Sequence, residues 1–306
     1  MKSLAIRYFY EVALKGSLSA ASESLHVAVS AISRQISTLE QDVGSPLFLR
    51  SARGMVLTEA GDILLRHVRR SMLETDTVLE SIAALRDAGL SPLRIACTQG
   101  LANEFVPSTL AHFGRLFPDI RFRIWVDSAE QATQRVESGE ADIALTFSTT
   151  PTTPASPVKV LYARGAPALA VMSQDHPLAR HRRLDIRDLA DYPIALTGEQ
   201  SSTFKLYQLA SNMVGTWVEP KVYSNYAEAL HAYVRDSQAI LFASYISIFQ
   251  RLKANRLVAI PLLNPEMHAR TVQVQVMQGR MLPDVIEQFL SFSIRRLNET
   301  VLEAPV

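Results

Sequence analysis

Residues 1–44 carry apolar side chains at the three- and four-residue spacing of amphipathic helices. The first such run predicts a helix that ends at Lys15-Gly16, a basic last turn followed by glycine. A short second helix is expected to begin at an N-cap, Ser19, and to end near His26-Val27. A third is expected from about Val29 to Asp42, before Gly44. The side chains expected to face inward are Ile6, Phe9, Val12, Ala13, Ala20, Ala21, Leu25, Ile32, Ile36, Leu39 and Val43.

The third helix has a polar face opposite its apolar one. Small hydroxyls and one arginine gather there, at Ser30, Ser33, Arg34 and Ser37. A helix of this kind, held by a tight turn behind a second short helix, suits the major groove of DNA, which is about 12 Å wide. The alternative is a solvated face without a partner.

Residues 46–57 favour the DNA-binding interpretation. They predict two short extended segments around a turn that carries Arg50, Arg53 and Gly54. Such a hairpin is typical of a wing whose arginines reach flanking phosphates or a narrow minor groove, whereas the alternative is ordinary surface charge. Residues 1–60 are therefore interpreted as a winged helix-turn-helix domain.

One long helix is expected after the wing, over residues 58–90. Thr58 is a suitable N-cap, and no proline follows before Pro92. Apolar positions alternate spacings of three and four, as in a two-helix coiled coil. This seam comprises Leu65, Val68, Met72, Thr75, Leu79 and Ile82. Its partner is either a second copy of the chain or the chain's own C-terminal domain.

Residues 91–306 alternate strand-like apolar runs with helical ones, which indicates an α/β domain on mainly parallel sheets. The Pro/Thr-rich stretch Thr149–Pro157 is interpreted as an irregular crossing between two lobes. The expected strands are Leu93–Cys97, Arg121–Val126, Asp142–Phe147, Pro167–Met172, Pro193–Leu196, Ala239–Ala243 and Thr271–Met277.

Composition and charge exclude several classes of protein. The 306 residues are 48% hydrophobic and 20% charged, as in ordinary globular domains. No apolar run approaches a membrane span of about 18 residues, and Glu11 interrupts any signal peptide, so we expect a cytoplasmic protein. The formal net charge of +1 does not by itself indicate nucleic-acid binding.

Candidate chemistry is sparse. Cys97, the single cysteine, excludes an internal disulfide and is expected to be a buried structural thiol rather than a redox sensor. No HExxH, Walker A or GxGxxG motif occurs, so we expect no metal, no cofactor and no catalytic activity.

At this point the sequence resembles the LysR-type transcriptional regulators. The segment from Gly16 to Leu65 is similar to the family's N-terminal signature at many fixed positions: Ala20-Ala21, Leu25, Ser30, Ile32-Ser33, Ile36, Leu39-Glu40, Gly44, Leu47-Phe48, Arg50 and Leu57-Thr58-Glu59-Ala60-Gly61. One departure is Val29, where the family often has Gln at the second position of the recognition helix. Val29 offers a base at most an apolar contact, such as one with a thymine methyl.

The resemblance continues through the C-terminal domain. Its landmarks are Pro107, Phe113, Phe117-Pro118, Gly139-Glu140-Ala141-Asp142, His176-Pro177-Leu178 and Asp191-Tyr192-Pro193. A second departure is Asp236-Ser237-Gln238-Ala239, where the family commonly shows two glycines. The resemblance implies a periplasmic-binding-protein-like (type 2) effector domain over 91–306, with lobe I at 91–162 and 267–306 and lobe II at 163–266. It also favours a homodimer through the linker helix and a homotetramer, reading an inverted repeat in promoter DNA.

An effector would lie beyond the carboxyl ends of the strands. Backbone N–H groups and a hydroxyl at a helix start suit a carboxylate. Plain helix capping is the alternative for Thr98 and Ser202, and a core position is the alternative for Phe147. The effector-binding residues expected are Thr98, Gln99, Gly100, Thr146, Phe147, Ser201, Ser202 and Thr203.

The sequence thus predicts a transcription regulator that binds double-stranded promoter DNA through Val29, Ser30, Ser33, Arg34, Ser37, Arg50 and Arg53. A small molecule in the interlobe cleft would change the contact with the promoter. The alternative function is a two-lobed solute-binding protein or enzyme whose N-terminal helices serve only for interaction.

Overall fold

The structure is a computed structural model that describes residues 4–51, 54–84, 92–149, 156–254 and 256–302. The chain divides into two compact units, Met1–Leu79 and Glu80–Val306, each with hydrophobic clusters of its own. The boundary expected between residues 90 and 91 lies outside the described residues.

The first unit is a winged helix-turn-helix, as predicted. Its core is closed by Phe9, Val12, Ile32 and Leu47, which are completely buried. Its elements are α1 (Leu4–Lys15), α2 (Leu18–Leu25), α3 (Val29–Val43), the antiparallel wing strands β1 (Phe48–Ser51) and β2 (Gly54–Leu57), and α4 (Glu59–Ala84).

Two local expectations for this unit are wrong. The N-cap of α2 is Ser17, whose Oγ accepts a hydrogen bond from Ala20 N at 3.4 Å, so Ser19 lies inside the helix and is exposed. Val43 is 47% exposed because it ends α3, so the buried stripe stops at Leu39.

The start of α4 explains why a glycine stands there. Thr58 caps the helix as predicted, since its Oγ1 accepts from Gly61 N at 3.0 Å. A Cβ on Gly61 would lie 2.1 Å from Leu47 O, so any larger residue would push α4 away from the segment that leads into the wing.

The apolar seam expected along α4 is divided. Leu65 and Val68 are buried in the core of the first unit, and Met72 packs against it. The later residues Leu79 and Ile82 are exposed. The first half of the stripe therefore serves the chain's own N-terminal unit, a use that was not anticipated.

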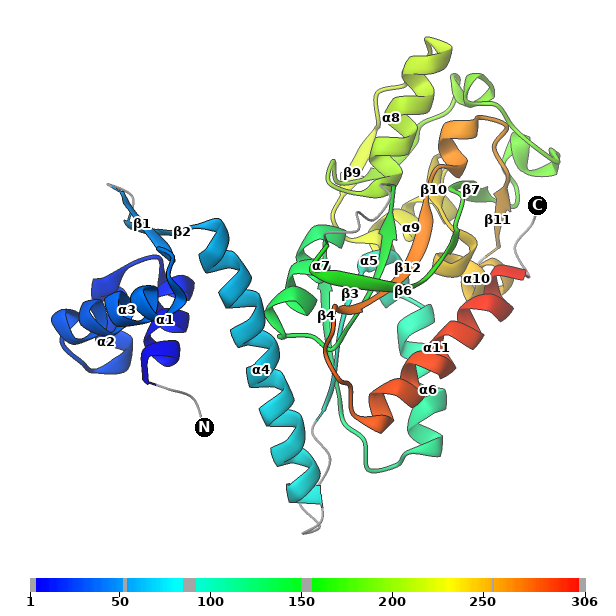
Figure 1. Ribbon diagram of the computed structural model, residues 1–306. Coiled ribbons are helices and arrows are strands. Elements are labelled where there is room, and N and C mark those ends of the chain that lie inside the picture. Colours follow the sequence, from blue (N-terminus) through cyan, green and yellow to red (C-terminus); the bar gives the residue numbers. More distant parts are fainter. Residues whose placement is uncertain (1–3, 52–53, 85–91, 150–155, 255, 303–306) are drawn as a thin grey trace. The chain divides into compact units, whose positions relative to one another are not determined.

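The second unit consists of two lobes, each built on a five-stranded sheet (Figure 1). Lobe I has the strand order β4-β3-β5-β12-β6; α7 packs on one face, and α6 and α11 pack together on the other. Its elements are β3 (Leu93–Thr98), α5 (Gln99–Ala102), α6 (Phe105–Leu116), β4 (Phe122–Asp127), α7 (Ala129–Ser138), β5 (Ile143–Ser148), β6 (Val158–Gly165), β12 (Thr271–Met277) and α11 (Asp284–Leu302).

Lobe II has the strand order β11-β7-β10-β8-β9. Side chains of α8 join the cluster on one face of this sheet, and those of α9 and α10 join the cluster on the other. Its elements are β7 (Leu169–Ser173), η1 (Pro177–Arg180), η2 (Ile186–Leu189), β8 (Ile194–Thr197), α8 (Ser202–Val214), β9 (Val222–Ser224), α9 (Ala227–Arg235), β10 (Ile240–Ala243), α10 (Tyr245–Ala254), β11 (Leu257–Ile260) and η3 (Pro265–His268).

Both sheets are mixed rather than mainly parallel. β3 and β8 pair in parallel with both of their neighbours, whereas β12 and β7 pair antiparallel with theirs. The alternation of helices and strands along the sequence does not reveal whether neighbouring strands run parallel or antiparallel. In lobe I, β12 runs antiparallel to its neighbours and enters the sheet after the chain returns from lobe II. The strands β6, β9 and β11 were not anticipated; β6 is an edge strand that is mostly exposed, and β9 has only three residues.

The crossings between the lobes also differ from expectation. The Pro/Thr-rich stretch, of which 150–155 lie outside the described residues, joins β5 and β6 of the same sheet, so it does not change lobes. Because β6 continues to Gly165, the chain leaves lobe I at about Ala166 and returns at Arg270. The two crossings are tied together, since Ala166 N donates to Arg270 O at 2.9 Å.

Candidate functional site

The outer face of α3 is the candidate DNA-reading surface. Ile32, Ile36 and Leu39 are buried beneath it, so helical geometry turns the polar side chains outward. Ser30, Arg34 and Ser37 are exposed, Ser33 is half-buried, and Val29 is 40% exposed at the first turn. The predicted set therefore shares one accessible face.

Arg50 connects the wing to this helix. Its Nη2 donates to Ser33 Oγ at 3.3 Å, so the guanidinium lies at the flank of α3. Arg53, the other wing arginine proposed for DNA, lies outside the described residues.

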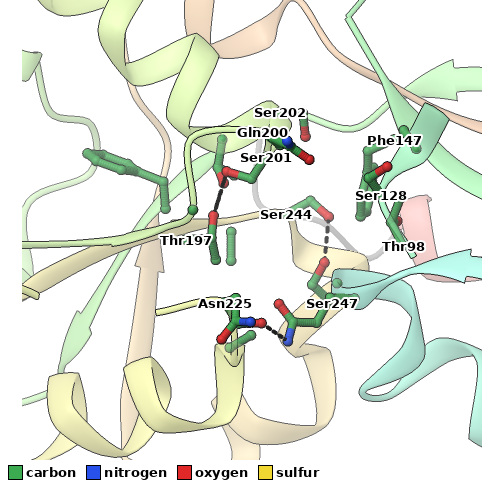
Figure 2. A pocket seen from close by; sticks show the side chains of 18 of the residues that line it. Thr98, Ser128, Phe147, Thr197, Gln200, Ser201, Ser202, Asn225, Ser244 and Ser247 are labelled. Carbon is green, nitrogen blue, oxygen red and sulfur yellow. Dashed lines mark hydrogen bonds between the residues drawn. The ribbon is translucent and has the colours of Figure 1, made fainter. Parts of the chain in front are cut away.

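The second candidate site is a cavity of about 550 Å³ between the two lobes of the second unit. This volume suits a small organic ligand. Figure 2 shows side chains converging on it from both lobes: the hydroxyls of Thr98 and Ser128 and the ring of Phe147 from lobe I, and the hydroxyls of Ser201 and Ser202 from lobe II. Of the predicted effector residues, all but one line this cavity: Thr98, Gln99, Gly100, Phe147, Ser201, Ser202 and Thr203.

Thr146 is the exception. Its side chain is buried in the lobe I sheet, on the strand face opposite that of its neighbour Phe147, and it does not line the cavity. The prediction took both residues from the end of one strand, although adjacent side chains of a strand point to opposite faces.

The hydroxyl of Thr98 is not used as a helix cap. It occupies the N-cap position of α5, yet its side chain makes no capping hydrogen bond, and the buried Oγ1 has no partner among the described residues. In lobe II the capping residue is Ser201, whose Oγ accepts from Phe204 N at 3.1 Å. The short α5, of four residues, does not make a helix-terminus anion site by itself.

Gly100 and Gln99 shape the inner wall of the cavity. A Cβ on Gly100 would lie 2.8 Å from Ser247 Oγ and 3.0 Å from a ring carbon of Phe147, so glycine lets these lobe I and lobe II elements approach. Gln99 Nε2 donates to Asn225 O of lobe II at 2.6 Å. Both residues therefore help set the distance between the lobes.

Several polar lining residues were not anticipated: Asn103, Ser128, Asn225, Ser244, Ser247 and Arg270. They lie in different elements and in the loops between them, and they share no motif. Asn103 Nδ2, like Thr98 Oγ1, is buried without a hydrogen-bond partner in the described part of the chain.

Arg270 is the buried cation of this cavity, with 3% of its surface exposed. Burial lowers its pKa to about 9, which still leaves the guanidinium charged at neutral pH. A signal was present in the sequence, since Arg270 directly precedes the last predicted strand, but nothing local marked it as buried.

A second charged cluster near the cleft is fully paired. Arg251 of α10 contacts Glu104 of lobe I at 3.0 Å and Glu228 of α9. Glu104 also accepts hydrogen bonds from Gln250 N and Arg251 N, while burial raises its pKa. His231, which lines the cavity and contacts Arg251, has a pKa of about 4 because burial disfavours its charged form, so it is neutral at pH 7.

Other chemistry finds little support in the described residues. They include no group of three or more His, Cys, Asp or Glu side chains placed to hold a metal ion. Burial and the nearby Asp127 raise the pKa of Cys97 to about 12, so the thiol stays protonated and unreactive. Among the helices that the structure describes, none combines the length and apolarity of a membrane span.

Comparison with protein families identifies both units. The model of the lysR-family bacterial regulatory helix-turn-helix proteins matches residues 4–62, and that of the LysR substrate binding domain matches residues 88–298. The chain belongs to the LysR family of transcription regulators. As a LysR-family regulator it binds DNA, carries an effector-binding domain and forms oligomers, and it is not an enzyme. The solute-binding or enzymatic alternative is therefore wrong.

Individual relatives agree with this assignment. The chain is 25% identical over 298 residues to the uncharacterised HTH-type transcriptional regulator YybE of Bacillus subtilis (strain 168), covering 96% of this chain and 98% of that one. It is 29% identical over 260 residues to the RuBisCO operon transcriptional regulator of Allochromatium vinosum, covering 83% of each.

Solved structures share the fold. A full-length OxyR variant from Pseudomonas aeruginosa superposes with a TM-score of 0.63 at 20% identity, covering 96% of this chain and 95% of that one. The effector-binding domain of QuiR in complex with shikimate gives a TM-score of 0.54 at 16% identity, covering 68% of this chain and 98% of that one.

Proposed function

We propose that this LysR-family regulator reads a specific promoter sequence and that a small molecule bound between the lobes of its effector domain changes that contact. The observation that carries the proposal is the cavity of about 550 Å³, which polar side chains of both lobes line and in which Thr98 Oγ1, Asn103 Nδ2 and Arg270 Nη2 are buried without partners in the described structure. Buried polar atoms are normally paired, so such a site is completed by a ligand.

The DNA side of the proposal rests on α3. Arg34, with the hydroxyls of Ser30, Ser33 and Ser37, would read base edges in the major groove, and Val29 would offer an apolar contact. Arg50 and Arg53 would bind flanking phosphates, which adds affinity without sequence information.

The oligomer side of the proposal rests on the second half of α4. Leu79 and Ile82 are exposed there, together with Val78, after the first half of the stripe has packed into the DNA-binding unit. We infer a homodimer through this segment, and a homotetramer of two such dimers. Sedimentation of Leu79→Asp should show a smaller species than the native chain, whereas Ile63→Asp, exposed earlier on the same helix, should not.

The test of function is fluorescence anisotropy with DNA from upstream of the regulator's own gene. The full-length chain should bind it more tightly than random DNA of equal length, and the affinity should fall with rising salt. A compound that binds the cleft should change this affinity. Equal binding to both DNAs at every salt concentration would contradict the proposal.

A further inference from the structure

Arg270 lies where the two lobes and the two crossings meet. Its Nε donates to Ala166 O at 2.9 Å, in the outward crossing, and Arg270 itself stands in the return crossing. Nη1 donates to Ser202 Oγ of lobe II at 3.2 Å, and the guanidinium carbon lies 4.5 Å from the centre of the Phe147 ring of lobe I. The guanidinium is thus fixed at the floor of the cleft by contacts with both lobes.

The positive charge of Arg270 has no counter-ion in the described structure. No carboxylate there lies within ion-pair distance, and the buried Nη2 lacks a hydrogen-bond partner. Of the acidic residues that line the cavity, Asp127 is already paired with Arg135 at 2.6 Å, and Glu199 is exposed. Buried charges are costly unless they are paired, so an unpaired one in a cavity indicates a missing anion.

The remaining unpaired groups of the cavity are also suited to an acceptor. Thr98 Oγ1 and Asn103 Nδ2 are buried and lack partners, and both can donate a hydrogen bond. They come from β3 and the end of α5 in lobe I, whereas Arg270 belongs to the crossing. One ligand that satisfies all three would need a negatively charged group and a further oxygen.

We propose that Arg270 binds the anionic group of the effector and that this group is a carboxylate, with a second oxygen of the ligand accepting from Thr98 or Asn103. This rests on the proposed function, because it assigns chemistry to the same cleft. One guanidinium balances the single charge of a carboxylate, whereas a phosphate, with a charge near −2, would remain partly uncompensated.

The experiment compares charged and uncharged probes on the full-length chain. Propionate, succinate and benzoate are each titrated against the matching propionamide, succinamide and benzamide, with inorganic phosphate as the alternative anion. Thermal unfolding and calorimetry report binding. At least one carboxylate should raise the Tm saturably, and its amide and phosphate should bind at least about tenfold more weakly.

Variants then assign the effect to Arg270. Arg270→Gln should weaken carboxylate binding at least about tenfold and leave the ligand-free Tm nearly unchanged, because removal of an uncompensated buried charge offsets the loss of the hydrogen bonds to Ala166 and Ser202. A purely structural arginine would instead lower that Tm when replaced. The matched control is Arg295→Gln, since Arg295 also lies over an aromatic ring, at 5.4 Å from Phe292, but is exposed and outside the cavity.

Three results would overturn the assignment: no carboxylate stabilises the native chain at 10 mM, amides or phosphate bind as tightly as carboxylates, or Arg270→Gln leaves carboxylate affinity unchanged. These failures differ from failure of the proposed function. If a neutral compound binds through Thr98 and alters DNA affinity, the proposed function is supported but the assignment of an anionic effector is wrong. If a carboxylate binds through Arg270 and leaves DNA affinity unchanged, the assignment of an anion is supported but the proposed function is wrong.

Discussion

Arg34 and Arg270 show how differently one side chain is used in the two units. Arg34 stands exposed on α3, where water solvates its charge, and in the proposed function DNA would replace that water. Arg270 is buried at the floor of the interlobe cavity with one nitrogen unpaired. Without a partner, the exposed Arg34 has no desolvation penalty, because water solvates it. The buried Arg270 has such a penalty, and an anion that binds there would reduce it. The two units therefore differ in the free energy of the ligand-free state.

The same contrast extends to the hydroxyls. Those of α3 face solvent or a neighbouring side chain, as Ser33 does toward Arg50, so replacing them should scarcely affect stability. In the cleft, Thr98 Oγ1 is buried and unpaired, so its replacement should affect the ligand and leave the fold intact. Substitutions in each unit test this contrast.

The largest effect on stability is expected for a buried side chain that packs beneath the candidate DNA-reading face of α3. Ile32→Ala removes a completely buried side chain beneath α3 and should destabilise the first unit by about 2–5 kcal/mol. DNA binding should be lost while the effector unit keeps its own unfolding transition. Denaturant unfolding of the full-length chain, followed by circular dichroism, measures both.

A matched isoleucine provides the control. Ile63 is 56% exposed on α4, and Ile63→Ala should change stability by no more than about 0.5 kcal/mol. If Ile32→Ala lowered the stability of both units equally, they would be one cooperative body and the contrast between them would lose its basis.

The next effect concerns the cleft. Thr98→Val keeps the shape of the side chain but removes the unpaired hydroxyl, and it should weaken effector binding by about 1–3 kcal/mol. The response of DNA affinity to the effector should disappear, while DNA affinity without effector stays near that of the native chain. Anisotropy with and without the effector measures both quantities.

Restoring the hydroxyl is the control for this variant, since Thr98→Ser should regain the response. A full response from Thr98→Val would show that the ligand lies elsewhere. Loss of basal DNA binding would show instead that Thr98 supports the fold.

The two sites also differ in how far the sequence predicts them. The reading face of α3 follows from helical periodicity within fifteen residues, and only the boundary at Val43 and the cap at Ser17 were misplaced. The cleft assembles residues from Thr98 to Arg270, and strand direction and the positions of the crossings decide which of them meet. Thr98 and Ser202 were found because they stand at strand and helix ends. Asn103 and Arg270 also stand at such ends, but their burial in the cleft depends on tertiary packing.

A smaller effect should distinguish residues that recognise the DNA sequence from residues that bind its phosphates. Arg34→Ala should cost about 1–3 kcal/mol of discrimination between operator and random DNA. Arg50→Ala should weaken binding to both and reduce the slope of log affinity against log salt by about 1. Anisotropy titrations on the two DNAs at several salt concentrations measure these quantities.

Arg66→Ala serves as the comparison, because Arg66 is exposed on α4, belongs to neither α3 nor the wing, and should change neither property. Equal losses from Arg34→Ala and Arg50→Ala on specific and random DNA alike would refute this division of labour.

The smallest effect is expected at Cys97, which shows that burial alone does not make a site. Its thiol is as buried as Arg270, but it packs among Ile95, Leu101 and other apolar side chains of lobe I and is uncharged. Because burial raises its pKa to about 12, almost no thiolate exists at pH 8, and the thiolate is the reactive form.

Hydrogen peroxide should therefore leave DNA affinity unchanged, and iodoacetamide should label the native chain slowly but the urea-unfolded chain fully. Cys97→Ala sets the background of the labelling assay. Native labelling as fast as unfolded labelling would mean that lobe I opens readily, and the unpaired groups of the cleft would then be reachable by water instead of awaiting a ligand.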